Sequence, residues 1–290
     1  MYALNNNQHL KFSSAGKIHY ALRIACVMCF IGHGSFGIIT KEIWANYFGV
    51  FGIGHAESFQ LMPWVGIFDI LFGLIILFYP IRAVVMWLVL WGFVTALLRP
   101  VSGEPFAEFI ERGGNFGAPL ALLILSGTTT LKNVFGPLRP DIKLSDTTLK
   151  SVTTVLRVVV CLLLAGHGWL NLIEKKGIIN QYMFLGFTNP GEAAQFIGFF
   201  EIVAGLSVLI RPVRSFILIL FIWKITTEFF YPHYEVFEWI ERGGSYGSIL
   251  ALWFALGSAS AAQNIELTRW PLRFPKAGIH FFLSKISSAL

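Results

Sequence analysis

Two histidine–acid pairs are the first residues in this sequence whose types and positions point to chemistry. His33 and His167 each stand between two glycines in a long apolar run, and Asp69 and Glu201 stand within the next apolar run. A carboxylate inside an apolar helix is costly, which points to function. Because histidine titrates near neutral pH, we expect each histidine to meet its acid as a catalytic proton relay. The alternative is an imidazole bonded to the backbone and an acid that fastens two helices.

A Glu-Arg-Gly-Gly motif occurs twice, in FIERGGNFGAPLAL at 109–122 and WIERGGSYGSILAL at 239–252. Each copy opens a helix, where unpaired amides and a partial positive charge favour anions. The motif therefore predicts a binding site for an anion or a carbonyl oxygen. Its residues are Arg112, Gly113 and Gly114 in the first copy and Arg242, Gly243 and Gly244 in the second. The alternative is that the glutamate and arginine pair locally while the glycines permit close packing.

Lys224 and Glu228 distinguish the second half of the chain from the first. They are spaced i,i+4, and the corresponding positions of the first half hold Gly92 and Ala96. We therefore expect ligand binding in the second half, with Lys224 and Glu228 contributing beside the second Glu-Arg-Gly-Gly motif. The alternative is that the two residues form a buried ion pair.

The cysteines do not indicate a disulfide framework. Cys26 and Cys29 form a C-x-x-C motif, but it lies in the middle of an apolar run rather than at a helix start, where thiolates are stabilised. Two buried thiols one helical turn apart are the favoured interpretation, and a redox dithiol is the alternative. The sequence shows no metal-binding, haem, iron–sulfur or flavin signature.

The composition places these residues in a membrane protein. Of the 290 residues, 55% are hydrophobic and only 13% are charged, whereas soluble domains are about 25% charged. Runs suited to membrane helices of about 20 residues predict an all-α fold with eight transmembrane helices. These runs lie near 18–39, 61–79, 81–99, 115–131, 152–173, 194–210, 213–231 and 245–262.

The eight runs form two copies of one four-helix unit. LRIACVMCFIGHG at 22–34 matches LRVVVCLLLAGHG at 156–168, and GIFDILFGL at 66–74 matches GFFEIVAGL at 198–206. We therefore predict two tandem four-helix bundles with a pseudo-twofold axis along the membrane normal. The expected divisions are an N-terminal tail (1–17), a first repeat (18–131), a cytoplasmic linker (132–151), a second repeat (152–262) and an interfacial C-terminal segment (263–290).

The distribution of charge predicts orientation and partners. Most Lys and Arg lie in the two tails, the linker and the turns near 80 and 211, whereas the opposite loops are rich in Glu. The positive-inside rule then places both termini in the cytoplasm of a cell with a bacterial-type inner membrane. Membrane lipids are the expected partners, and nucleic acid is excluded.

With these motifs the chain resembles the DoxX/DoxD-like family of four-helix membrane proteins, here as a tandem fusion. The resemblance rests on the first-helix Gly-His-Gly, the second-helix acid in GFFEIVAGLSVLIRPVRSF and the glycine-bearing final helix. It spans nearly all of both halves. Members include the small subunit of thiosulfate:quinone oxidoreductase. The resemblance implies a membrane subunit that handles quinone, or a thiol or sulfur redox partner, at the outer face.

Three functions fit these patterns. The first is a quinone-linked redox protein, in which His167 and Glu201 move protons while Arg242 and Lys224 bind an anionic or carbonyl oxygen. The second is a transporter of a small molecule or lipid. The third is a non-catalytic subunit or scaffold that binds a partner protein in a larger complex.

Overall fold

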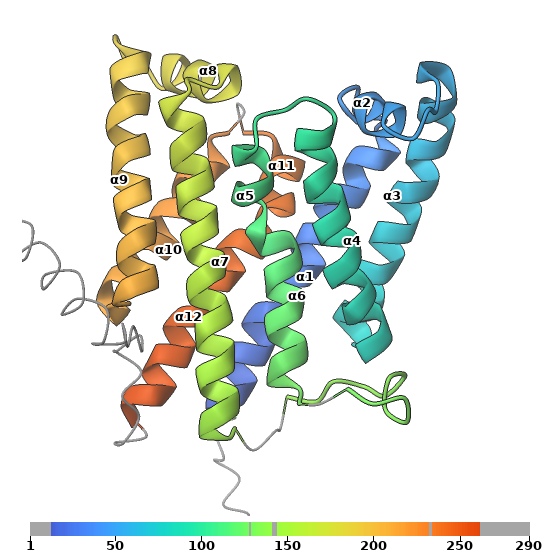
Figure 1. Ribbon diagram of the computed structural model, residues 1–290, viewed down its shortest axis with the longest axis vertical. Helices are drawn as coiled ribbons and strands as arrows, with labels where there is room; N and C mark the ends of the chain where they lie inside the picture. The colour runs from blue at the N-terminus through green and yellow to red at the C-terminus, as the bar shows by residue number, and fades with distance from the viewer. Residues whose placement is uncertain (1–12, 128, 141–143, 232–233, 262–290) are drawn as a thin grey trace, which may run out of the picture.

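The computed structural model describes residues 13–127, 129–140, 144–231 and 234–261, and these fold into α-helices (Figure 1). Most of the predicted N-terminal tail and the whole predicted C-terminal segment 263–290 lie outside the described residues. The helices are α1 (Ser14–Ile38), α2 (Trp44–Gly49), α3 (His55–Phe78), α4 (Arg82–Val101), α5 (Ala107–Glu111), α6 (Gly113–Leu125), α7 (Asp146–Leu172), α8 (Lys176–Phe184), α9 (Pro190–Ile210), α10 (Arg214–Phe229), α11 (Val236–Glu241) and α12 (Gly243–Ala261).

Five of these helices, α1, α3, α4, α7 and α9, are long and apolar enough to cross a membrane. The prediction of eight transmembrane helices is therefore wrong for the described part of the chain. α6 has 13 residues and α10 has 16, which correspond to about 20 and 24 Å of helix, short of the roughly 30 Å hydrocarbon core. α6 is short because the helix is interrupted at Arg112, which separates it from α5.

The outer helices present large apolar side chains to their surroundings. Trp64, Phe68 and Phe78 on α3 and Phe196 and Phe199 on α9 are each more than half exposed. So many exposed aromatic rings would be unfavourable in water, whereas lipid chains accommodate them. The apolar exterior and the five long helices together indicate a helical membrane protein.

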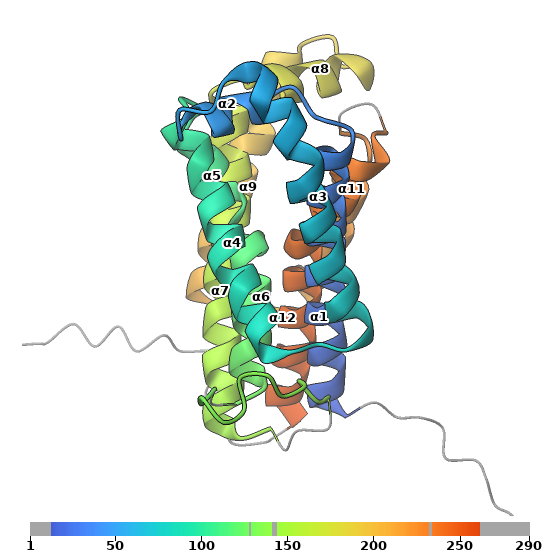
Figure 2. The ribbon, with the colours of Figure 1, turned by 90° about the vertical axis from the view of Figure 1, so that its right-hand side faces the viewer.

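The two repeats interleave instead of forming two separate bundles. α1, α6, α7 and α12 occupy the centre, with α3 and α4 on one flank and α9 and α10 on the other (Figures 1 and 2). Within a repeat, α1 packs along α3 and α7 along α9. Across repeats, α1 packs on α11 and α12, and α7 packs on α5 and α6. The prediction of two tandem four-helix bundles is therefore corrected to one intertwined bundle in which the repeats make matching contacts.

Glycines allow the same close helix approach in both repeats. A Cβ atom at Gly34 would lie 2.6 Å from the carbonyl oxygen of Gly66, and one at Gly168 would lie 2.6 Å from that of Gly198. These distances leave no room for a side chain, so the α1–α3 and α7–α9 pairs each depend on paired small residues. The acids of the two histidine–acid pairs lie on these contact faces.

The four short helices α2, α5, α8 and α11 gather at one end of the molecule, which we call the short-helix end (Figure 2). The segment that joins α6 to α7 lies at the opposite end. α1 and α7 start at that opposite end with equivalent caps: the Ser13 side chain accepts a hydrogen bond from the Gly16 amide, and the Ser145 side chain accepts one from the Thr148 amide. Both helices therefore carry their histidines toward the short-helix end.

Candidate functional site

His33 and Asp69 form the first pair that the sequence predicts. Nδ1 of His33 on α1 lies 2.7 Å from Oδ2 of Asp69 on α3, and the Asp69 side chain is only 2% exposed. None of the described residues forms a hydrogen bond with Nε2 of His33. The carboxylate thus fixes the imidazole and leaves one ring nitrogen for a further partner.

His167 and Glu201 form the equivalent pair between α7 and α9, through Nδ1 and Oε2. More polar groups surround this pair. Asn171 donates to the carbonyl oxygen of His167 at 2.9 Å, and the Tyr182 hydroxyl donates to Oδ1 of Asn171 at 2.6 Å. The corresponding positions of the first repeat hold a glycine and a phenylalanine, so these hydrogen bonds belong to the second repeat alone.

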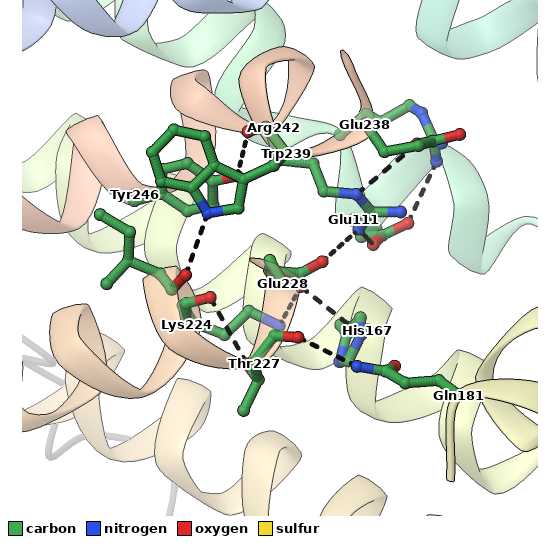
Figure 3. A network of polar contacts seen from close by, with 12 residues as sticks. Glu111, His167, Gln181, Lys224, Thr227, Glu228, Glu238, Trp239, Arg242 and Tyr246 are labelled. Atoms are coloured by element: carbon green, nitrogen blue, oxygen red, sulfur yellow. Dashed lines mark hydrogen bonds and ion pairs between the residues drawn. The ribbon is translucent and has the colours of Figure 1, made fainter. Parts of the chain in front are cut away.

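Lys224 and Glu228 extend the second pair into an ion network (Figure 3). Nζ of Lys224 lies 3.2 Å from Oε1 of Glu201 and 2.6 Å from Oε1 of Glu228. Glu228 also lies 3.6 Å from Nε2 of His167. Because Lys224 is fully buried, its ammonium group depends on these two carboxylates for compensation. Lys224 and Glu228 therefore have the geometry of a buried ion pair, which is the alternative that the sequence left open for them.

Arg242 joins the two repeats (Figure 3). Its Nη1 lies 2.8 Å from Glu228 and 2.8 Å from Oε1 of Glu111, and Nη1 of Arg112 lies 3.1 Å from the other oxygen of Glu111. Both motif arginines therefore meet at Glu111. Burial alone would raise the pKa of Glu111, but the attraction of Arg242 and Arg112 outweighs burial and holds that pKa well below its usual range.

A second cluster surrounds Glu108, whose side chain is fully buried. Arg112 lies 2.6 Å from its carboxylate, Arg99 lies 3.6 Å away, and Lys175 contacts the other oxygen. Burial would raise the pKa of Glu108, but Arg112 and Lys175 lower it further than burial raises it. This cluster ties α4 and α5 to the start of α8.

Glu241 is the exception among these buried acids. It occupies the position of Glu111 in the second copy of the motif and is only 5% exposed, yet it forms no hydrogen bond or ion pair within the described part of the chain. Its surroundings are three cavities, all of which it lines. The repeats thus differ most sharply at this carboxylate.

Two of the cavities lie at equivalent places in the two repeats. The first has a volume of about 130 Å³ and is lined by His33 and Trp91, and the second has a volume of about 200 Å³ and is lined by the matching His167 and Trp223. The second cavity also has Glu201 and Glu228 in its wall. Its polar wall is therefore already occupied by paired charges.

The first cavity is rich in aromatic side chains. Most of them come from the short helix α2 and the chain that follows it, and Trp44 packs against His33 with 4.6 Å between ring centroids. Polar groups of both repeats reach the same space. The residues that could hold a ligand there are the aromatic Trp44, Tyr47, Phe48, Phe51 and Trp91 and the polar His33, Thr95, Arg99, Arg112, Asn115 and Glu241.

The motif glycines lie in helix contacts. A Cβ atom at Gly114 would lie 2.7 Å from the carbonyl carbon of Gly244, and one at Gly244 would lie 3.0 Å from the carbonyl oxygen of Gly114. Gly113 faces Leu162 in the same way, and Gly243 faces the side chain of Met28. This geometry matches the close-packing alternative for the motif, in which the two copies meet each other between the repeats.

The structure brings together a possible metal-binding group that the sequence analysis did not identify. Ligand atoms of Glu111, His167 and Glu228 all lie within 4.8 Å of one another. These residues come from three different helices, so no local spacing signals the group. The carboxylates already pair with Arg242 and Lys224. A divalent cation would have to share these oxygens with two buried cations, which makes the fit poor.

Five predicted site residues of the second half, His167, Glu201, Lys224, Glu228 and Arg242, therefore belong to one network, whereas His33 and Asp69 stand apart beside the first cavity. Two acids of these clusters were not predicted from the sequence: Glu108, and Glu238, which contacts Lys41 and lies 3.9 Å from Nε of Arg242. Their i,i+4 spacing to the motif arginines could have revealed them. Trp44 carries no signal in the sequence, because distant segments bring it to the cavity. Glu241 opens the second Glu-Arg-Gly-Gly motif, but its place in the wall of the first cavity depends on contacts between the repeats.

The cysteines take no part in either cavity. Cys26 and Cys29 are buried in the core of α1, and Cys161 is buried in α7. All three are free thiols. Cys26 and Cys29 are thus two buried thiols, as the favoured interpretation of the C-x-x-C motif has them.

Comparison of the chain with models of known families, with curated proteins and with solved structures finds no match. The resemblance to DoxX/DoxD-like proteins therefore rests on the short sequence motifs alone.

Proposed function

We propose that this membrane protein binds a quinone-type ring in the cavity of its first repeat, as a membrane subunit of a redox system. The observation that carries the proposal is the His33–Asp69 pair. Asp69 fixes the imidazole through Nδ1, while Nε2 is left unbonded by the described residues and the ring lines an aromatic cavity. A histidine oriented by a carboxylate in this way can exchange a proton with a bound ligand.

The lining of the cavity fits a flat ring with polar oxygens. Trp44 and Trp91 offer faces for stacking, since aromatic rings attract one another in offset or edge-on arrangements. Arg99 and Arg112 line the same cavity and can donate hydrogen bonds to a carbonyl oxygen. An aromatic and aliphatic cavity whose polar groups can fix the orientation of a ligand is typical of small-molecule sites.

The chemistry assigns separate tasks to this chain and to its partner. Reduction of a quinone to a quinol takes up two electrons and two protons. His33 can pass a proton to or from a ring oxygen, and the electrons would come from a partner redox protein. The proposed DoxX/DoxD-like relationship is compatible with this division, because that resemblance also implies a quinone-handling subunit at the outer face of a bacterial-type inner membrane.

The proposed binding site lies in the first repeat, whereas the sequence favoured a site in the second. In the second repeat, Lys224 and Glu228 neutralise each other and Glu228 also pairs with Arg242. A ligand oxygen there would compete with existing ion pairs. In the first repeat, Gly92 and Ala96 stand at the corresponding positions, so the first cavity has no counterpart of the Lys224–Glu228 pair.

The test is titration of the purified protein in nanodiscs with a short-tailed benzoquinone, followed by tryptophan fluorescence. We expect binding, measured by quenching, to weaken about tenfold in Kd when His33→Ala removes the imidazole or Asp69→Leu removes the acceptor that holds it, since one lost hydrogen bond in a buried site costs about 1.4 kcal/mol. His167→Gln is the matched variant in the other repeat, and it should leave Kd unchanged. Absence of saturable quenching, or equal weakening by His167→Gln, would overturn the proposal.

A scaffold role is the second candidate, and the network of the second repeat favours it. Arg242, Glu111 and Glu228 link α5, α10 and the start of α12 in one buried cluster. Such a cluster can hold a surface in shape for a partner protein. If scaffolding is the function, Arg242→Ala lowers the melting temperature and releases a co-purifying partner, while quinone fails to bind the wild type.

A further inference from the structure

The two copies of the Glu-Arg-Gly-Gly motif leave one buried carboxylate without a partner. Glu111 pairs with Arg112 at 3.1 Å and with Arg242 at 2.8 Å. Its counterpart Glu241 pairs with neither, although it is only 5% exposed. A buried carboxylate without hydrogen bonds is expensive. Something that donates hydrogen bonds is therefore expected beside it.

The neighbouring side chains explain why Glu241 is left over. Arg242 turns toward Glu111 and Glu228, and the latter is a glutamate that the first repeat lacks. Arg112 turns toward Glu108 and Glu111. Nη1 of each arginine thus contacts other acids, and Glu241 is left lining three cavities, among them the first.

Glu241 faces that cavity as an ionised acceptor. Burial would raise its pKa, but the attraction of Arg112 and Arg99 outweighs burial and lowers it. A carboxylate in this form accepts hydrogen bonds and donates none. The arginines stabilise the charge of the Glu241 carboxylate without contacting it. Its oxygens therefore still need hydrogen-bond donors.

His33 presents a second acceptor to the same space. The 2.7 Å contact uses Nδ1 of His33, and in the neutral tautomer that donates to Asp69 through Nδ1 the other nitrogen, Nε2, carries a lone pair. Glu241 and His33 come from different repeats, and both line the aromatic cavity. Two acceptors in one cavity favour a ligand that carries hydrogen-bond donors, whose oxygens can in turn accept from Arg99 and Arg112.

We propose that the cavity of the first repeat takes a ring with free hydroxyl groups, of the quinol or phenol class, in preference to its oxidised or O-methylated forms. This inference rests on the proposed function, since it names the redox form that the same cavity prefers. Glu241 would accept a hydrogen bond from one hydroxyl, and His33 could accept one at Nε2. The second repeat thereby completes the binding site of the first.

Calorimetric titration under anaerobic conditions tests the inference with three probes that share one short tail: a quinol, its quinone and its dimethyl ether. For the wild type we expect the quinol to bind at least about tenfold more tightly than either of the others, because each lost donor leaves a buried acceptor unpaired. Glu241→Gln should reduce this preference, since an amide presents one acceptor oxygen in place of two. Glu42→Gln, at an exposed glutamate of the same end, should not.

The outcomes separate the two proposals. If none of the three probes binds, the proposed function fails and this inference fails with it. If the three bind equally to the wild type, or if Glu241→Gln keeps the full preference, the cavity binds rings but the inference about donors is wrong. The wild-type comparison of quinol with dimethyl ether decides the matter even if the Glu241 variant does not fold.

Discussion

Arg242 of the second repeat binds Glu111 of the first through a contact of 2.8 Å between Nη1 and Oε1, across 131 residues of sequence. The contact joins the two copies of the motif at the short-helix end. It also removes Arg242 from Glu241, the neighbouring acid of its own copy. A single cross-repeat ion pair thus fastens the two halves and breaks their symmetry beside the aromatic cavity.

The Glu111 carboxylate should be essential for stability. Glu111→Gln removes the carboxylate that Arg112 and Arg242 share and leaves these arginines only Glu108 and Glu228, and removal of one member of a buried pair costs about 3–5 kcal/mol. We expect a clear fall in the free energy of unfolding, measured by denaturant titration in detergent. Glu42→Gln removes one member of the exposed His55–Glu42 pair and should change stability by less than about 1 kcal/mol. Equal effects of the two changes would contradict this assignment.

Lys224 and Glu228 should behave as a coupled pair. Lys224→Met leaves Glu201 and Glu228 facing each other without the ammonium group and should be strongly destabilising. Adding Glu228→Leu removes one of those carboxylates, so the double variant should lose less stability than the sum of the single variants. Melting temperatures of the four proteins give the coupling energy. Additivity within about 0.5 kcal/mol would show that the pair does not interact.

Gly114→Ala should disturb the contact between the two motif copies. The added Cβ would lie 2.7 Å from the carbonyl carbon of Gly244, and such overpacking costs about 1–3 kcal/mol. Gly49→Ala is the matched control, because a Cβ there meets nothing within 4 Å and alanine favours helix. The first variant should melt at a lower temperature and the second should not. The prediction fails if both melt alike.

Acid should destabilise the protein through the depressed pKa of Glu111. A lowered folded-state pKa contributes stability that is fully present above the unfolded value near 4.5 and is lost as the pH falls toward the folded value. We therefore expect unfolding free energies that decline below about pH 4.5, and a shallower decline in Glu111→Gln. Glu108 and Glu241, whose pKa values are also lowered, contribute to the remaining slope. Identical slopes in both proteins would exclude Glu111 as a contributor.

The orientation in the membrane can be tested by cysteine labelling. Phe51 at the short-helix end is 65% exposed and Leu131 at the opposite end is 96% exposed, while the native cysteines are buried. If the basic segments lie in the cytoplasm, an impermeant maleimide should label Phe51→Cys on intact bacterial spheroplasts. It should label Leu131→Cys only after lysis. The reverse pattern would invert the proposed topology.

Local sequence features predicted the parts of this protein that depend on local geometry. The apolar runs predicted helices, and the small residues flanking Asp69 predicted the helix face that meets α1, because spacing along one helix fixes its faces. Both histidine–acid pairs follow from those two facts. Because the two halves are copies, a pairing of His33 with Asp69 predicts an equivalent pairing of His167 with Glu201.

Features that depend on contacts between distant segments could not be predicted in the same way. Gly32 packs against the backbone of Glu241, and Gly166 packs against that of Glu111. These contacts exist because the last helices of each repeat pack on the first helix of the other repeat, which no local pattern in the sequence predicts. The preference for one cavity over the other depends on such distant contacts too. Lys224 and Glu228 suggest a ligand site when read alone, whereas in the structure their charges are met by Glu201 and Arg242.

Photoaffinity labelling tests the central claim most directly, because it locates the bound ring. The protein in nanodiscs would be irradiated with an azido-substituted, short-tailed quinol, with and without excess unlabelled quinol, and the modified peptides mapped by mass spectrometry. We predict competable labels in residues 44–53 and 91–99, which line the cavity beside His33. Competable labels in 181–187 and 223–230, the walls of the second cavity, or labels that excess quinol does not reduce, would contradict the account.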